Sequence, residues 1–376
     1  MKKCIMISDS FKGTLSSREI CEIARRTVPQ YFSDCEVVSI PVADGGEGTV
    51  DCFAEALSAE VVTVPVSGPY GEPVEAAYAR KDALAVIEMA SAAGLPMVAD
   101  RKDPSATTTY GVGQLIRHAV EHGCREILLG LGGSCTNDGG CGCAAALGVQ
   151  FFDAAGNTFV PCGGTLSKIA RVDAAACREL LKDVAITCIC DVDNPLYGPT
   201  GAAYVFAPQK GADAAMVELL DGQLQALGSV LERELNINIA DMPGAGAAGG
   251  FGGGAVALLD AQLRPGIEVV LDTVDFDRHL RDAELVITGE GRVDSQSVRG
   301  KVISGVARRT SAAGVPLVVI AGSIAESAEE AYGLGVTAMF GIDREAVAFE
   351  TYAHKSAENY RRTLGDVLRL IRAVRK

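Results

Sequence analysis

The same local pattern occurs at both ends of this chain, and it restricts the fold more than any other feature. A short apolar segment is typical of a buried strand, a loop with glycine and carboxylate residues follows it, and a helix comes next. The pattern begins with residues 3–8 and 36–43, and it returns with residues 284–288 and 316–321. Strands that alternate with helices in this way predict a parallel sheet covered by helices.

The middle of the chain has a different rhythm, because residues 61–88 contain short strand-like runs joined by glycine and proline turns. We therefore predict an α/β protein with two α/β domains. One is a doubly wound, mainly parallel sheet that both chain ends form, from residues 1–66 and 285–376. The other is a mixed α/β domain inserted between them, residues 67–284.

Charge and composition exclude several classes of partner. The 34 basic and 48 acidic residues give a net charge of -14, which argues against binding to nucleic acid or to an anionic membrane surface. A local group of backbone amides can still hold a small anion. With 48% hydrophobic residues the chain can form a core, but no apolar stretch approaches the roughly 20 residues of a membrane span.

The cysteines are typical of buried thiols. Several of the 12 lie in or beside apolar runs. The pairs Cys141/Cys143 and Cys188/Cys190 have one residue between them instead of two, and no histidine stands near either, which argues against zinc. Only a short apolar run follows Met1, so no secretion signal is expected. We therefore expect 12 free thiols and a cytoplasmic protein.

Polar loops follow five of the expected strands, at the edge where ligands of open parallel sheets bind. Glycines let backbone N–H groups approach an anion, and carboxylates hold Mg²⁺ or accept a proton. Phosphoryl transfer uses such backbone N–H groups and carboxylates, so we predict a site for a small anionic molecule. Each loop taken alone is equally typical of a turn or a helix cap. The loops are residues 8–13, 44–48, 130–140, 191–195 and 289–294.

The sequence gives no support to three familiar types of functional site: a P-loop, a dinucleotide-binding loop and a histidine metal site. The phosphate-binding motif G-x-x-x-x-G-K-[ST] is absent from the sequence. Residues 244–249 match the dinucleotide motif G-x-G-x-x-G, but they do not follow a strand. The surrounding segment, residues 243–254, is equally consistent with a flexible linker and with an ordered turn at a helix start. His118 and His122 are four residues apart, which we interpret as a solvated helix face.

Seven segments resemble those of the bacterial glycerate kinase family of the type-one class, and the last is followed by Gly300-Lys301. They occur in order over nearly the whole chain, and several are long and specific. The segments are SDSFKGTLSS (8–17), PVADGGEGT (41–49), GLGGSCTNDGG (130–140), CDVDNPL (190–196), FAPQKGA (206–212), PGAGAAGGFG (243–252) and VITGEGRVDSQS (286–297).

The resemblance implies ATP-dependent phosphorylation of D-glycerate with Mg²⁺, at the 2-hydroxyl to give 2-phosphoglycerate. It also implies two α/β domains with the active site in the cleft between them. The alternatives are a glycerate 3-kinase and a non-catalytic sensor of sugar acids, whereas a 2-hydroxy-acid dehydrogenase would need a dinucleotide motif after a strand. Expected partners are D-glycerate and ATP, without nucleic acid or membrane, and a homo-oligomer is left open.

Glycerate carries a carboxylate and two hydroxyl groups, so its site needs a cation or an amide nest and a base. For the catalytic base we favour Asp191, followed by Asp44. For the substrate we expect Lys12 with the amides around Ser10 and Gly13, with Arg292 as the alternative cation.

The remaining expected roles concern the metal and the nucleotide. Asp193 and Glu290 are candidates for Mg²⁺. Any one of these residues can also be an ordinary turn or cap residue. The expected nucleotide- or phosphate-binding residues are Gly132, Gly133, Ser134, Asn137, Lys210, Gly289 and Gly291.

Overall fold

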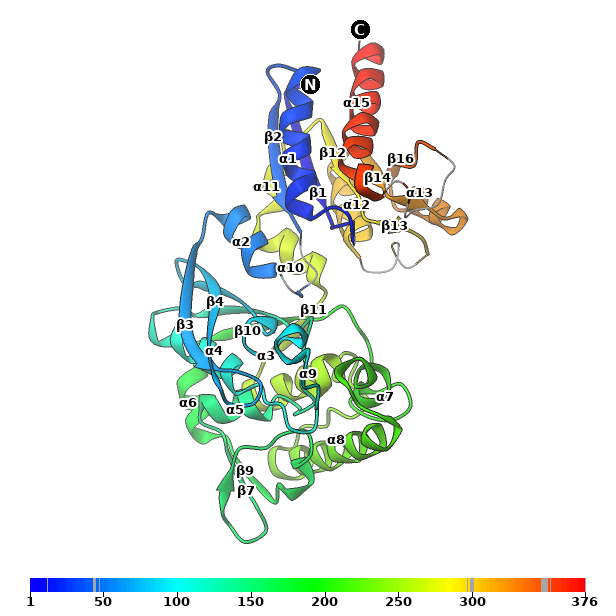
Figure 1. The fold of residues 1–376 in the computed structure, drawn as a ribbon. Coiled ribbons are helices and arrows are strands. Elements are labelled where there is room, and N and C mark those ends of the chain that lie inside the picture. Colours follow the sequence, from blue (N-terminus) through cyan, green and yellow to red (C-terminus); the bar gives the residue numbers. More distant parts are fainter. Residues whose placement is uncertain are drawn as a thin grey trace. The chain divides into compact units, whose positions relative to one another are not determined.

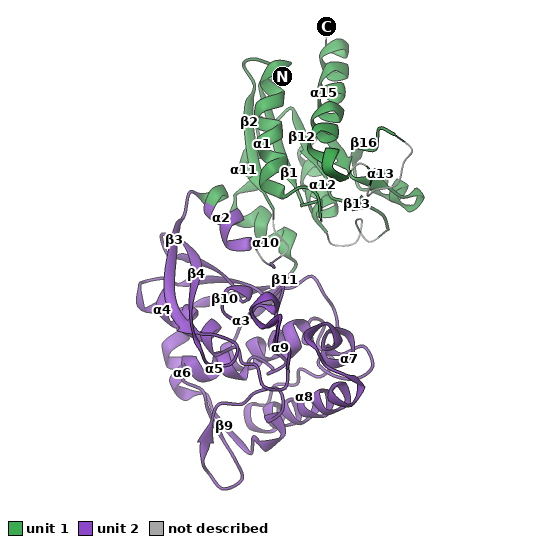
Figure 2. Ribbon diagram, viewed as in Figure 1, with its two compact units in different colours: residues 1–44, 55–57, 265–376 green, residues 45–54, 58–264 purple. Residues whose placement is uncertain are grey.

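The chain forms two compact units (Figure 2), residues 1–44, 55–57 and 265–376 in unit 1 and residues 45–54 and 58–264 in unit 2. The computed structural model describes residues 1–11, 13–42, 45–46, 48–295, 297, 301–345, 351 and 353–375.

Unit 1 contains a parallel sheet whose strand order is β16-β14-β12-β1-β2 (Figure 1). Strand β1 pairs in parallel with β12, with Cys4 opposite Leu285 and Met6 opposite Ile287. The prediction that the first strand and residues 284–288 share one sheet is confirmed. The strands are β1 (Lys3–Ser8), β2 (Glu36–Pro41), β12 (Leu285–Thr288), β14 (Leu317–Ala321) and β16 (Val336–Gly341), with a separate short pair of β13 (Arg292–Val293) and β15 (Ser323–Ile324).

Helices cover both faces of this sheet. Side chains of α1 and α15 pack with Met6 and its neighbours in one core cluster. Helix α12 packs against β12 and β14, and Ile5 and Ile7, which alternate with Met6, are also fully buried. The helices are α1 (Ser17–Thr27), α10 (Gly266–Thr273), α11 (Phe276–Leu280), α12 (Val302–Ala313), α13 (Glu330–Gly333) and α15 (Ser356–Val374).

Helix α1 begins directly after Ser16, and side chains of the first turn cap its start. Ser16 Oγ accepts from the backbone N–H of Glu19 at 3.2 Å, and Ser16 N–H donates to Glu19 Oε2 at 2.8 Å. This is a capping box, in which each side chain satisfies the other residue's backbone donor. It fixes the path of the chain directly after the loop that follows β1.

Unit 2 contains a mixed sheet of order β11-β10-β6-β5-β4-β3 and a small sheet of order β8-β7-β9. Strands β5, β6, β10 and β11 run parallel, and β3 and β4 are antiparallel. The strands are β3 (Glu60–Ser67), β4 (Pro73–Lys81), β5 (Leu84–Glu88), β6 (Glu126–Gly130), β7 (Gln150–Phe152), β8 (Thr158–Phe159), β9 (Arg171–Asp173), β10 (Ala185–Ile189) and β11 (Gln262–Arg264).

In unit 2, helices α4 and α9 pack against strands of the mixed sheet, and α7 and α8 lie beside α9 (Figure 1). Helix α2 begins in unit 2 and ends in unit 1. The helices are α2 (Thr49–Leu57), α3 (Ala90–Ala93), α4 (Tyr110–Glu121), α5 (Cys141–Leu147), α6 (Ala175–Leu181), α7 (Ala202–Phe206), α8 (Ala214–Leu235) and α9 (Ala247–Leu259). The α/β fold with one parallel and one mixed sheet agrees with the predicted class.

The boundary between the units differs from the expected division at residues 66 and 284. Strand β3 pairs with β4 from Glu60 opposite Arg80 to Ser67 opposite Pro73, so residues 60–66 belong to unit 2. The glycine and proline turn after residue 67 joins these two strands as a hairpin, so the expected division at residue 66 separates two strands that pair. Residues 265–284, with α10 and α11, belong to unit 1.

The glycine-rich segment is ordered and forms part of α9. Three successive residues, Ala248, Gly249 and Gly250, have positive φ angles of 53°, 69° and 87°. A Cβ atom on Gly249 would lie 2.1 Å from the carbonyl oxygen of Thr136. The backbone of α9 therefore packs directly on another loop, which excludes the flexible linker.

All 12 cysteines are free thiols, as predicted, and Cys162 and Cys190 alone are half-buried while the others are buried. None of the helices in the described part of the chain combines the length and the apolar character of a membrane span.

Candidate active site

The loop between β6 and α5 in unit 2 is organised around a buried lysine. Lys210 is 2% exposed, and its Nζ donates to Ser134 Oγ at 2.8 Å and to the carbonyl oxygen of Thr136 at 2.7 Å. Burial lowers the pKa of Lys210 to about 8, although the nearby Cys135 and Asp138 act in the opposite direction. Lys210 and Ser134, both of which the sequence suggested for phosphate binding, are thus in direct contact.

Asp138 fixes the same loop from the other side, and sequence reasoning did not single it out. Its carboxylate is fully buried and accepts four hydrogen bonds, from the backbone N–H and hydroxyl of Thr109 at 2.8 Å each and from the N–H groups of Gly140 and Gly142 at 3.1 and 3.2 Å. Desolvation raises the pKa of this carboxyl, and these donors lower it. Asp138 thus ties the loop to the starts of α4 and α5.

Two other side chains of this loop are buried without partners. Asn137 Oδ1 and Nδ2 and Thr136 Oγ1 make no hydrogen bond with any described residue, although both residues are fully buried. Buried polar groups are almost always hydrogen-bonded in native structures. Such groups in a strand-end loop indicate a place for a ligand or for ordered water.

The expected phosphate role of Gly132 is not supported by its backbone donor. Its N–H donates to the carbonyl oxygen of Gly45 at 2.9 Å, and a Cβ on Gly132 would lie 2.6 Å from Gly46 Cα. Gly132 therefore brings two backbones together. Gly133, in contrast, is exposed and has a positive φ of 74°.

The contact with Gly45 and Gly46 locates part of the second predicted loop, residues 44–48, at the carboxyl end of β6. Asp44 itself lies outside the described residues. Some amides of this loop are already occupied, because Glu88 at the end of β5 accepts from the N–H groups of Gly48, Thr49 and Val50. Burial raises the pKa of Glu88.

The loop after β10 carries Asp191 and Asp193, which are both exposed. Strand β10 is the parallel neighbour of β6, with Ile189 opposite Gly130, so the two loops begin at the same edge of the sheet. The glycine-rich segment supports this loop, since Gly246 N–H donates to the carbonyl oxygen of Asn194 at 3.0 Å. The same segment also contacts the β6–α5 loop at Thr136.

In unit 1 a second group of predicted residues follows β1 and β12. Ser8 Oγ and the N–H of Asp9 both donate to the carbonyl oxygen of Gly289 at 2.9 Å. Glu290 is 8% exposed, and its Oε1 has no hydrogen-bond partner among the described residues. Desolvation raises the pKa of Glu290, a hydrogen bond from Ser297 and the charge of Lys301 lower it, and the charges of Asp9 and Asp294 raise it again.

The other predicted residues of unit 1 differ in their surroundings. Gly289 and Gly291 lie at close backbone contacts, because a Cβ on Gly289 would lie 1.8 Å from Ile320 O and Gly291 accepts from the N–H of Ser323. Ser10 N–H donates to Asp9 Oδ1 at 2.6 Å.

Two expected substrate-binding residues of unit 1 are exposed. Gly13 forms a turn with a φ of 83°. The side chain of Arg292 is 70% exposed, 3.9 Å from Asp294. Lys12 lies outside the described residues.

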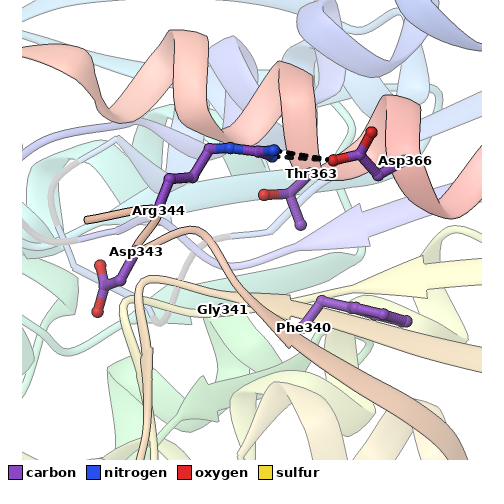
Figure 3. Close-up of a pocket in the computed structure, with 6 residues that line it drawn as sticks. All are labelled: Phe340, Gly341, Asp343, Arg344, Thr363 and Asp366. Atoms are coloured by element: carbon purple, nitrogen blue, oxygen red, sulfur yellow. Dashed lines mark hydrogen bonds and ion pairs between the residues drawn. The ribbon is translucent and has the colours of Figure 1, made fainter. Parts of the chain in front are cut away.

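A pocket in unit 1 involves none of the predicted residues. It lies beside β16 and α15, where both Nη atoms of Arg344 donate to Asp366 Oδ2 at 3.0 Å (Figure 3). We assign it no role in the reaction. The lining residues are Phe340, Gly341, Asp343, Arg344, Thr363 and Asp366.

These features define a two-unit α/β protein with buried polar groups and carboxylates at strand ends, as phosphoryl transfer requires. The model of the glycerate kinase family matches residues 4–372. The chain therefore belongs to the glycerate kinase family and is an enzyme, a kinase. The resemblance seen in the sequence is confirmed.

Individual relatives agree with this assignment. The chain is 43% identical to a glycerate kinase of Bacillus subtilis over 368 residues, 97% of this chain and 96% of the relative. It is 42% identical to a glycerate 2-kinase of Escherichia coli over 343 residues, 90% of each. The crystal structure of a glycerate kinase 2 from Salmonella typhimurium is similar, with a TM-score of 0.88, 40% identity and 99% of each chain covered.

Proposed function

We propose that this enzyme transfers the γ-phosphoryl group of ATP to the 2-hydroxyl of D-glycerate and forms 2-phosphoglycerate. The observation that carries the choice of position is the 42% identity with a glycerate 2-kinase over 90% of both chains. The alternatives, transfer to the 3-hydroxyl and binding without transfer, have no comparable support.

The proposed base is Asp191. In the reaction the hydroxyl oxygen bonds to the γ-phosphorus while the bond to the leaving ADP oxygen breaks, and the hydroxyl proton passes to the Asp191 carboxylate. Two observations support this role: Asp191 is exposed, and it lies two residues after the end of the apolar strand β10, at the same sheet edge as the β6–α5 loop. Asp44 is the second candidate.

We propose that the phosphates of ATP and the carboxylate of glycerate are bound by residues in the loops that follow the strands. Ser134, Asn137 and Gly133 of the β6–α5 loop are the candidates for phosphate. Lys12, with Ser10 and Gly13, is the candidate for the glycerate carboxylate, and Arg292 remains the alternative. That the site lies in a cleft between the domains stays a prediction.

For Mg²⁺ we propose Glu290 and Asp193 as ligands. The fit rests on Glu290, whose buried Oε1 has no partner among the described residues and is the hard oxygen donor that Mg²⁺ prefers. No group of three acidic, histidine or cysteine side chains that would suit a metal occurs in the described part of the chain. This is consistent with Mg²⁺ that takes one or two carboxylates and otherwise water and phosphate oxygens. When bound, Mg²⁺ would offset the charge of the phosphates.

The product decides between the candidate functions. The enzyme is incubated with D-glycerate, ATP and Mg²⁺, and the product is examined by ³¹P and ¹H NMR. We expect phosphorus coupling to the single proton on carbon 2. Coupling to the two protons on carbon 3 would identify a 3-kinase, and binding of D-glycerate without ADP release would identify a sensor.

We further propose a cytoplasmic enzyme, because all 12 cysteines are free and a reducing compartment keeps thiols in that state. Cell fractionation tests this. The net charge of -14 supports the absence of nucleic acid and anionic membranes among its partners. A homo-oligomer stays open, and light scattering in solution would detect it.

A further inference from the structure

Lys210 is a buried cation whose hydrogen bonds go to neutral groups. Its Nζ donates to the hydroxyl of Ser134 and to the carbonyl of Thr136, and its side chain is almost fully buried. The carboxylate of Asp138 is near enough to influence the pKa of Lys210, but its oxygens accept four other donors. A buried charge of this kind is normally compensated by an anion.

The lysine determines which way the hydroxyl of Ser134 donates. An ammonium group has three donors and no acceptor, so Ser134 Oγ must be the acceptor in this hydrogen bond. The hydroxyl proton of Ser134 therefore points away from Lys210. A hydroxyl that accepts from a cation is also a stronger donor, because hydrogen bonds in a chain polarise one another.

Two more polar groups of the loop complete the arrangement. Asn137 Nδ2 and Thr136 Oγ1 are fully buried and have no partner among the described residues. The hydrogen bond from Lys210 to the carbonyl oxygen of Thr136 fixes the backbone directly before Asn137. Residues 134–137 thus provide three side-chain donors, the hydroxyls of Ser134 and Thr136 and the amide of Asn137. The ammonium group of Lys210 lies beside them.

We propose that the β6–α5 loop is an oxyanion subsite in which Ser134 and Asn137 donate to one anionic group, and that Lys210 is the positioning residue that holds it. Lys210 then acts through Ser134 and Thr136 and does not touch the ligand. This inference rests on the proposed function and deepens it. The oxyanion is either a phosphate of ATP or the carboxylate of glycerate, and binding measurements distinguish the two.

The test compares Lys210→Met, Ser134→Ala and the double variant by calorimetry. A non-hydrolysable ATP analogue and D-glycerate are titrated separately, without turnover. A lost hydrogen bond to a charged group should weaken one of the two ligands by about ten- to a hundred-fold. The ligand that is affected identifies the source of the oxyanion. Lys182→Met, which removes an exposed lysine paired with Glu179, is the control.

The double variant tests whether Lys210 acts through Ser134. If so, the double variant should bind the affected ligand about as weakly as the weaker single variant, because both changes remove the same interaction. Losses that multiply would mean that Lys210 and Ser134 act independently, which overturns the proposal that Lys210 acts through Ser134.

The pH profile is a readout that a purely structural lysine would not change. Since the pKa of Lys210 is about 8, the affinity of the wild-type protein should fall as the pH rises above about 8, and Lys210→Met should lose that fall. Cys135 and Asp138 face Lys210, and burial raises both of their pKa values, that of Cys135 to about 12. If Lys210→Met does not fold, two measurements still test the proposal: the pH dependence of ligand affinity in the wild-type protein and the ligand affinity of Ser134→Ala.

The possible outcomes separate the two proposals. Wild-type protein that binds neither ligand would contradict the proposed function. Wild-type protein that binds both, with unchanged affinities in Lys210→Met and Ser134→Ala, would overturn the oxyanion subsite while leaving the kinase intact. A fall in affinity above pH 8 that persists in Lys210→Met would also overturn it.

Discussion

At the scale of single residues, burial distinguishes the two acidic side chains that we propose for the base and for the metal ion. Glu290 is buried with a raised pKa, whereas Asp191 is exposed at the end of a strand. A general base must be ionised and within reach of the substrate hydroxyl. The exposed carboxylate of Asp191 is accessible to a substrate hydroxyl, and a buried carboxylate with a raised pKa is better suited to a metal ion, which favours the ionised form.

The first prediction concerns Asp191→Asn. A base contributes roughly 10²–10⁴-fold to the rate, so turnover should fall by at least about two orders of magnitude. The fold and the affinity for nucleotide should persist, because the amide has the same shape. Steady-state kinetics measures the turnover, and calorimetry measures the affinity for nucleotide. Asp183→Asn is the matched control, because Asp183 lies just before the same strand, β10, at its opposite end and is also exposed.

Turnover above about a tenth of the wild-type value in Asp191→Asn would mean that Asp191 is not the base. Asp44 would then be the first candidate, and Asp44→Asn the next variant. If neither substitution affects turnover, the strand-end loops do not supply the base, and the assignment of both carboxylates is wrong.

The second prediction concerns Lys210 and the stability of the free enzyme. Its folded pKa of about 8 lies below the ordinary value of 10.5, so between these pH values the unfolded chain binds the proton that the folded chain has lost. The contribution of Lys210 to stability therefore rises as the pH rises from about 8 to about 10.5. Its contribution to ligand affinity should fall over the same range.

Urea unfolding at about pH 7.5 and about pH 10 measures this contribution as the difference between wild-type protein and Lys210→Met. Other groups that titrate in this range contribute to both proteins and cancel. The free energy of unfolding of the wild-type protein should increase relative to the variant at the higher pH. The opposite sign would mean that Lys210 is stabilised as a cation in the free enzyme.

At the scale of elements, the glycine-rich start of α9 joins two candidate loops. Gly246 bonds to Asn194 in the loop after β10, and Gly249 packs on Thr136 in the loop after β6. Ala248 has a φ of 53°, a conformation that costs an alanine roughly 1–2 kcal/mol. Strain of this kind persists where the surrounding structure requires it.

The third prediction compares two Gly→Ala substitutions. Gly249→Ala introduces a Cβ 2.1 Å from a carbonyl oxygen at a positive φ, so it should cost about 2–4 kcal/mol of stability and lower turnover. Gly222 lies inside α8 with open space around its Cβ position. Gly222→Ala should stabilise by about 0.4–1 kcal/mol and leave turnover unchanged. Urea unfolding and kinetics of both variants measure these effects, and equal effects would contradict the joining role of α9.

Local signals in the sequence predicted many of these elements but few of their contacts. The capping box of Ser16 and Glu19 marks the start of α1, and the repeated strand pattern predicts that β1 and β12 share a sheet. The bond between Asp138 and Thr109 joins residues 29 positions apart and leaves no local trace. The sequence suggests that Gly132 binds phosphate, but in the structure its N–H donates to the carbonyl oxygen of Gly45.

At the scale of the whole molecule, each unit has its own sheet with predicted residues at the carboxyl ends of neighbouring parallel strands. These are β1 and β12 in unit 1 and β6 and β10 in unit 2. The order of strand-like and helix-like segments in the sequence indicates two units. The residues at which the chain passes from one unit to the other depend on which strands pair. Strand β3 shows this, because its pairing with β4 assigns it to unit 2.

The last prediction concerns the thiols of the whole chain. All 12 are free, but the native protein should expose only Cys162 and Cys190 to a thiol reagent, because the other ten are buried. Burial raises the pKa of Cys190, so it should react more slowly than an ordinary thiol. In denaturant without reductant, all 12 should react. Protein kept from air that gives ten or fewer would contain a disulfide and contradict the expected reducing compartment.

If Asp191 belongs to the active site, ligands should also change the native thiol reaction. Cys190 directly precedes Asp191, and its Sγ donates to the carbonyl oxygen of Val192 at 3.3 Å. D-glycerate with a non-hydrolysable ATP analogue should therefore slow the reaction of Cys190. Cys162, whose Sγ lies 3.5 Å from Thr165 Oγ1 in a different loop, is the internal control. Equal rates for Cys190 with and without ligands would argue against substrate binding at the loop after β10.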